Sequence, residues 1–78
     1  MAINLDKKKN SVVIKWTNNF SQETGFVKSV NREGKHFENT FDQSEAKVYG
    51  NKGCATTAIK ALLSYGEGEN NTFEIVPV

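Results

Sequence analysis

The stretch GFVKSVNREGKHFENTF, residues 25–41, decides the fold. Two alternating runs in it are divided by the polar residues 31–34, Asn-Arg-Glu-Gly. Asn31 is favoured at the start of a type I turn, and Gly34 at its end can supply the positive φ of a bulged hairpin. The stretch therefore predicts a β-hairpin with strands over residues 25–30 and 35–41.

The predicted turn fixes which residues of the two strands lie opposite each other. The expected pairs are Phe26 with Thr40, Lys28 with Glu38, and Val30 with His36. Opposite charges in the middle pair support this register. Alternation then places Val27, Phe37 and Phe41 on the core face of the sheet. Phe26 and Val30 are left on the outer face.

Before the hairpin, residues 11–17 alternate as a strand, with Val12, Ile14 and Trp16 on one face. After the hairpin, residues 54–65 have apolar side chains at helical spacing. The helical stripe consists of Ala55, Ala58, Ile59, Leu62 and Tyr65. Asn51 can cap the start of this helix and Gly66 can end it. Residues 72–78 alternate again, and Pro77 suits an edge strand.

This order predicts an α+β fold, β-β-β-α-β: a mainly antiparallel four-stranded sheet with one helix packed on one face. We expect the last strand beside the first and parallel to it, because a helical crossover returns the chain in the same direction. With 78 residues there is room for one domain, at residues 11–78, after a flexible N-terminal segment at residues 1–10. The residues expected to be mostly buried are Val12, Ile14, Trp16, Val27, Phe37, Phe41, Ala58, Ile59, Leu62 and Ile75.

Composition and charge limit the expected partners and location, although they leave a local basic patch possible. The formal net charge of +1 gives no global attraction to nucleic acid or to an anionic membrane. The single cysteine, Cys54, cannot form an internal disulfide. Residues 1–10 lack the apolar core of a signal peptide, and no apolar run is long enough to cross a bilayer. We therefore expect a cytoplasmic protein that does not contact membranes.

Catalytic chemistry is poorly supported. Nucleophilic catalysis needs a nucleophile in hydrogen-bond contact with a base, whereas His36 and Cys54 belong to elements expected on opposite sides of the sheet. A metal site needs three or four clustered ligands, and Glu67 and Glu69 are only two carboxylates on a glycine loop. The sequence predicts no enzymatic activity, no bound metal and no cofactor.

From residue 41 onward, the sequence contains a pattern made mostly of packing positions. It consists of Phe41-Asp42, Glu45-Ala46-Lys47, Tyr49, Ala55, Ala58, Leu62 and Phe73-Glu74-Ile75-Val76. In this pattern the chain resembles small uncharacterised proteins of Gram-positive bacteria and their phages. The resemblance brings no active site with it. It implies a small accessory protein, of prophage origin, that acts by binding another macromolecule.

The expected outer sheet face is the candidate binding surface. An apolar patch edged by cations often marks a partner site. The residues of this face are Val13, Lys15, Phe26, Lys28, Val30 and His36. We therefore predict a protein-binding module and leave self-association open. It is also open whether strand pairing or the N-terminal segment covers Phe26, which would leave no functional face.

The alternative is a nucleic-acid-binding module that uses the same basic and aromatic face. Exposed aromatic rings can stack on the bases of a single strand. Residues 34–36 and 52–55 also resemble parts of a double-stranded RNA-binding domain. That family, however, has a helix before its strands and ends in a helix, whereas this chain has no room for the first helix and ends in a strand.

Overall fold

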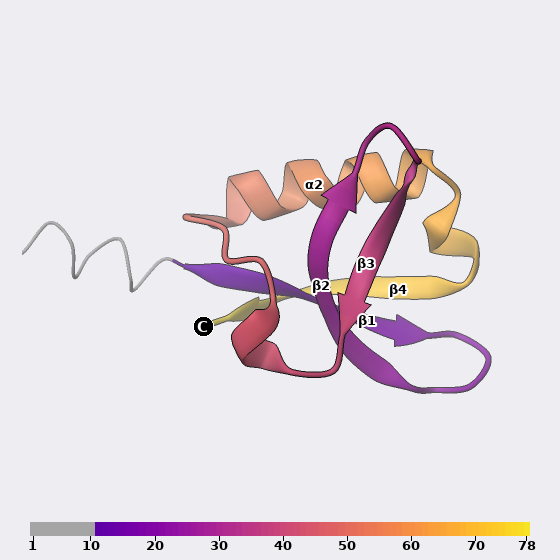
Figure 1. The fold of residues 1–78 in the computed structure, drawn as a ribbon, viewed down its shortest axis with the longest axis horizontal. Helices are drawn as coiled ribbons and strands as arrows, with labels where there is room; N and C mark the ends of the chain where they lie inside the picture. Colours follow the sequence, from indigo (N-terminus) through magenta and orange to yellow (C-terminus); the bar gives the residue numbers. More distant parts are fainter. Residues whose placement is uncertain (1–10) are drawn as a thin grey trace, which may run out of the picture.

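The computed structural model of the chain describes residues 11–78, so the flexible segment expected at residues 1–10 lies outside the described residues. The elements are β1 (Val12–Asn18), β2 (Thr24–Asn31), β3 (His36–Thr40), the 3-10 helix η1 (Gln43–Glu45), α2 (Lys52–Ser64), the 3-10 helix η2 (Glu67–Glu69) and β4 (Asn71–Pro77). One antiparallel sheet has the strand order β3-β2-β1-β4, and α2 packs against it (Figure 1). The predicted α+β class and the place of the last strand beside the first are confirmed.

The predicted direction of the last strand is wrong. β4 runs antiparallel to β1, with Ile75 opposite Ile14. The chain does not pass from β3 straight into the helix. It first returns along the sheet to the start of β1, where the backbone amides of Val12 and Tyr49 each donate to the other residue's carbonyl, at 2.9 and 2.8 Å. The helix then runs alongside β1, and β4 returns in the opposite direction, paired with β1 (Figure 1).

Local capping signals set the limits of α2 as expected. The side chain of Asn51 accepts a hydrogen bond from the backbone amide of Cys54 at 2.9 Å, which satisfies a free donor of the first turn. Beyond the last turn, Gly66 adopts a left-handed conformation with φ of 89°. The helix packs mainly over β1 and β4, and the β2–β3 hairpin reaches the same core through Val27, Val30 and Phe37.

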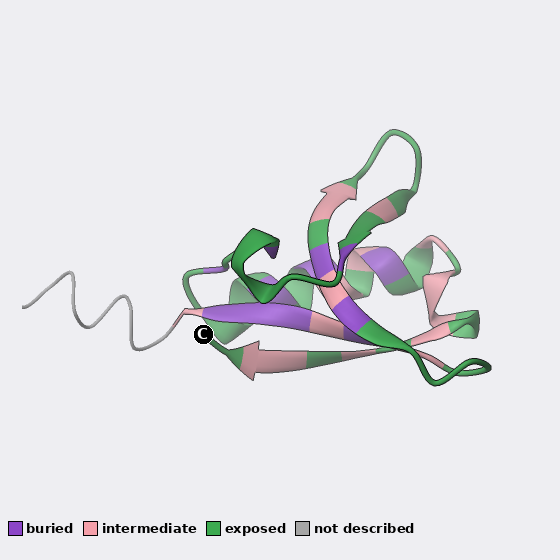
Figure 2. Cartoon of the chain, turned by 60° about the horizontal axis from the view of Figure 1, so that its bottom comes forward, coloured by how far each residue is buried: buried purple, intermediate pink, exposed green. Residues whose placement is uncertain are grey.

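The core lies between α2 and the inner face of β1, where buried residues are concentrated (Figure 2). Of the expected core, Val12, Ile14, Trp16, Val27, Ala58 and Leu62 are buried, and Phe37, Ile59 and Ile75 are half-buried against them. Phe41 is 67% exposed, so its assignment to the core is wrong. The reason is that β3 ends at Thr40, and alternation no longer governs the next side chain. Phe41 instead meets the edge of the Trp16 ring, with centroids 5.8 Å apart.

A bulge divides the hairpin register. Phe26 opposes Thr40 as predicted, but beyond Val27 the pairing shifts by one residue. The observed pairs there are Ser29 with Glu38, Val30 with Phe37, and Asn31 with His36. The predicted pairs of Lys28 with Glu38 and of Val30 with His36 are therefore wrong. The shift turns Val30 toward the core, against which it packs together with Phe37.

The turn itself explains the shift. Asn31 accepts a hydrogen bond from the backbone amide of Gly34 at 2.7 Å, as its position predicted. The positive φ, however, falls on Lys35 (57°) and not on Gly34. The last paired residues are Asn31 and His36, so the loop consists of residues 32–35, one residue later than the predicted turn at residues 31–34.

Lys35→Gly is expected to stabilise the protein by about 0.5–1 kcal/mol, because the left-handed conformation costs a residue with a Cβ about 1–2 kcal/mol. Glu33→Gly in the same turn is the control. Its φ is not positive, so the added flexibility of the unfolded chain should lower stability by about 0.4–1 kcal/mol. Urea unfolding of both variants measures the difference. A loss of stability in both would show that Lys35 carries no conformational cost.

Candidate binding pocket

The outer-face patch expected from the sequence does not assemble. Lys28 and His36 are exposed, while Lys15 and Phe26 are half-buried. Val13 is only 1% exposed, and Val30 packs against the core. The two valines therefore cannot supply the apolar centre of the patch, and their assignment to it is wrong. The bulge turns Val30 toward the core. Val13 adjoins the point where Tyr49, in the returning segment between η1 and α2, pairs with Val12 of β1.

The sheet opens between β1 and β2. The two strands pair only from Lys15–Phe26 to Thr17–Thr24. Further along, the carbonyl of Val27 accepts from the amide of Lys47 at 3.0 Å, and Val12 pairs with Tyr49. Residues 47–49 thus take the place of a strand partner where β1 and β2 diverge.

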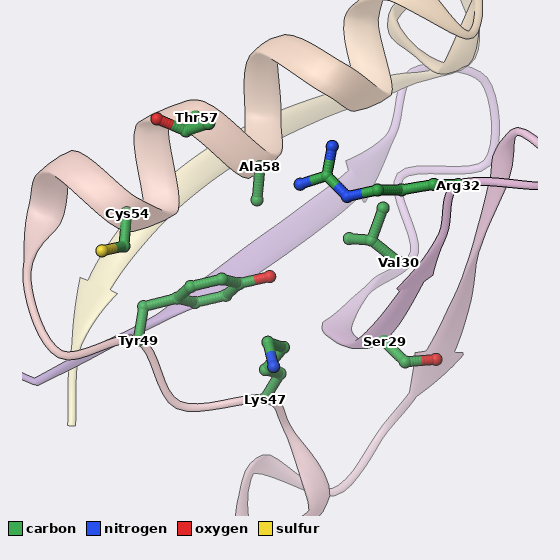
Figure 3. A pocket seen from close by; sticks show the side chains of 8 residues that line it. All are labelled: Ser29, Val30, Arg32, Lys47, Tyr49, Cys54, Thr57 and Ala58. Carbon is green, nitrogen blue, oxygen red and sulfur yellow. The ribbon is translucent and has the colours of Figure 1, made fainter.

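A pocket of about 490 Å³ lies beside this opening (Figure 3). It is bounded by the C-terminal end of β2, by residues 47–49 and by the first half of α2. Its volume is within the range of about 300–1,000 Å³ that is typical of small-molecule sites. The side chains that line it are Ser29, Val30, Arg32, Lys47, Tyr49, Cys54, Thr57 and Ala58.

The charged side chains of the pocket are all positive. Arg32 comes from the hairpin turn and Lys47 from the returning segment, and no carboxylate lines the pocket. The Lys47 ammonium lies 5.6 Å from the centre of the Tyr49 ring. Within residues 11–78, the structure gives neither cation a carboxylate partner. A concave site with two unpaired cations carries a positive local potential, although the net charge of the chain is only +1.

Tyr49 is the most unusual residue of the pocket. The residue is 8% exposed, and among residues 11–78 its hydroxyl is the buried side-chain polar atom without a hydrogen-bond partner. Figure 3 shows the ring lying across the pocket with the hydroxyl directed toward the Val30 side, below Ala58. Burial raises the pKa of Tyr49, and the nearby charge of Arg32 opposes this. The hydroxyl therefore keeps its proton at neutral pH and is a donor.

An unpartnered buried hydroxyl is costly. Leaving such a group unsatisfied costs about 1–3 kcal/mol, so a folded protein rarely retains one without a reason. Here the hydroxyl is covered at the wall of a pocket whose charged side chains are both cations, so a small movement of that wall would let an acceptor complete its hydrogen bonding.

A second hollow, of about 200 Å³, is lined by Trp16, Asn18, Phe37, Asn39 and Asn71. Two of its amides are already used within the protein. Asn18 accepts from the backbone amides of Phe20 and Ser21, both at 2.9 Å, and Asn71 donates to the Glu67 carbonyl at 3.4 Å. This hollow is smaller and carries no charge, so it is the weaker candidate site.

Sequence reasoning missed the main pocket. It treated Tyr49 as a packing residue and gave no role to Arg32, Lys47 or Thr57. Cys54 lines the pocket, whereas His36 does not. In the described part of the chain, no three His, Cys, Asp or Glu side chains are grouped as a metal site would need. No helix over residues 11–78 has the length and apolarity that crossing a membrane requires. The absence of enzymatic activity stays a prediction.

No protein-family model matches the chain, and neither a curated protein nor a solved structure does. The resemblance of the chain from residue 41 onward to small uncharacterised proteins of Gram-positive bacteria and their phages therefore stays a prediction. The fold and the pocket define a class in physical terms. It is a small α+β domain with a positively charged pocket between its hairpin and its helix.

Proposed function

We propose that this chain is a non-enzymatic binding module that receives a segment of another protein in the pocket between β2 and α2. The observation that carries the proposal is the unpartnered Tyr49 hydroxyl, buried in a pocket that Arg32 and Lys47 make positive. The pocket is large enough for a side chain and its neighbouring backbone. Its walls include apolar side chains, Val30 and Ala58, that can exclude water from such a contact.

The sheet face that suggested nucleic-acid binding offers less support. On that face Lys15 lies between Phe26 and Glu74, its partners on either side. A carboxylate beside the cation repels phosphate, and half-burial of Phe26 limits its use for base stacking. A nucleic-acid backbone requires a row of cations, and the cation on this part of the face is flanked by a carboxylate instead.

A cytoplasmic site of action is part of the proposal, because Cys54 is free and exposed, as suits a reducing compartment. The proposal also includes the accessory role and the prophage origin that the resemblance implies. Self-association stays open, because a second copy is one kind of protein partner.

Peptides selected from a random display library on the wild-type protein provide the test. Thr57→Trp fills the pocket mouth from the exposed side of α2. The affinity of the selected peptides should fall by at least about tenfold. Thr56→Trp is the matched control, because Thr56 is also exposed on α2 but does not line the pocket. It should leave affinity unchanged.

Two results would contradict the proposal. The first is that Thr57→Trp and Thr56→Trp bind the selected peptides as the wild type does. The second is that an oligothymidylate binds the wild type more tightly than any selected peptide, with an affinity that falls steeply as salt rises, which is the behaviour of a nucleic-acid-binding protein.

A further inference from the structure

We infer that the pocket recognises an oxygen anion, a carboxylate or phosphate group, carried by the bound protein segment. The inference rests on the proposed function, since it names the chemistry that the pocket selects in its partner. Three donors line this pocket: Arg32 comes from the hairpin turn, and Lys47 and Tyr49 come from the segment between η1 and α2.

The first two donors are the cations. The guanidinium of Arg32 extends from the hairpin turn across the pocket toward α2, and Lys47 enters from the returning segment (Figure 3). Arg presents a planar fork of donors that matches two oxygens of a carboxylate or phosphate. No carboxylate of the lining neutralises either cation. Both residues are exposed, so a neutral ligand group would forgo their charge-assisted hydrogen bonds and a cationic group would be repelled by them.

The third donor is Tyr49. Its hydroxyl is buried and unpartnered, so the pocket lacks an acceptor for it. An anionic oxygen held by Arg32 and Lys47 would accept this hydrogen bond once a small movement of the ring uncovers the hydroxyl, which has almost no accessible area in the free protein. Burial raises the pKa of Tyr49, so the hydroxyl keeps its proton and remains a hydrogen-bond donor beside the anion. One ligand group would thus satisfy the two charges and the orphan hydroxyl together.

The Thr57 hydroxyl competes little for a ligand. The Thr57 hydroxyl donates to the Gly53 carbonyl at 3.1 Å, so its proton is already used within the helix. The walls formed by Val30 and Ala58 are apolar and strengthen charge-assisted hydrogen bonds inside the pocket by excluding water. The lining therefore favours a ligand that brings acceptors and negative charge.

The test uses a peptide selected on the wild-type protein and two synthetic versions of it. One version has each Asp and Glu replaced by Asn and Gln, and the other carries phosphoserine at the acidic positions. We expect the amide version to bind at least about tenfold more weakly. Whether the acidic or the phosphorylated peptide binds more tightly identifies the source of the anion, and the inference is supported only if that peptide also binds more tightly than the amide version.

Protein variants provide the second arm. Arg32→Gln and Lys47→Gln should each weaken binding of the acidic peptide severalfold or more, and the effect should shrink at high salt. Lys28→Gln is the control, because Lys28 is exposed on β2 and does not line the pocket. Tyr49→Phe should also weaken binding, yet it should raise the thermal stability of the free protein. A merely structural role for the hydroxyl would give lower stability and unchanged binding.

The outcomes separate the two proposals. If the amide peptide binds as tightly as the acidic one while Thr57→Trp still blocks both, the pocket is a peptide site but the anion inference is wrong. If Thr57→Trp blocks neither peptide, the proposed function fails, and the inference fails with it. Equal affinity of Arg32→Gln, Lys47→Gln and wild type for the acidic peptide overturns the inference as well.

Discussion

Leu62→Ala is expected to lower the free energy of unfolding by about 2–5 kcal/mol, the usual range for truncating a fully buried leucine. Leu62 is 0% exposed and belongs to the core cluster with Ile14 and Trp16. The cost includes the lost burial and the cavity that α2 cannot close, because capping at both ends and packing on β1 hold the helix in place. A domain of this size has a stability near the lower end of about 5–15 kcal/mol, so the variant should be partly unfolded at physiological temperature.

The neighbouring residue provides a matched control. Leu63 is 51% exposed, so Leu63→Ala should cost under about 1 kcal/mol. Thermal unfolding of both variants measures the contrast, since each 1 kcal/mol shifts Tm by about 4–8 °C in a domain of this size. Equal Tm values for the two variants would mean that the helix face is wrongly placed.

Gly25→Ala should destabilise the protein by about 1–3 kcal/mol or more, because the new Cβ has no room. A Cβ built at Gly25 would lie 2.5 Å from Cζ2 and 2.7 Å from Cε2 of Trp16, and 2.9 Å from the Thr40 carbonyl oxygen. The indole cannot easily move aside, since its Nε1 donates to the Phe26 carbonyl at 3.2 Å. The Thr40 carbonyl belongs to the sheet backbone and is also fixed.

Gly50→Ala is the control for this substitution. A Cβ at Gly50 meets nothing within 4 Å, and the φ of this residue is not positive. Its stability should therefore stay within about 0.5 kcal/mol of wild type. Chemical unfolding followed by tryptophan fluorescence reports both the stability and the displacement of Trp16. A Gly25→Ala protein with wild-type stability and fluorescence would show that the ring does not lie over this glycine.

The candidate site shows why a sequence can predict a fold better than it predicts a binding pocket. Arg32 lies in the hairpin turn, far in sequence from Lys47 and Tyr49, and none of the three marks its role by spacing. They meet because β1 and β2 diverge and residues 47–49 fill the gap. The backbone bonds that hold this arrangement join segments distant in sequence, so no local preference encodes them.

The sequence by itself determined the elements. Alternation predicted the strands, helical spacing predicted the stripe of α2, and Asn51 and Gly66 predicted its two ends, because each signal depends on residues a few positions apart. The bulge at Lys28 and the exposure of Phe41 follow from the conformation of the turn and from the end of β3, which alternation did not locate. The tertiary structure alone decided the antiparallel direction of β4 and the pocket. These features depend on where the chain travels between elements. That path is set by packing against distant strands, which short-range periodicity does not record.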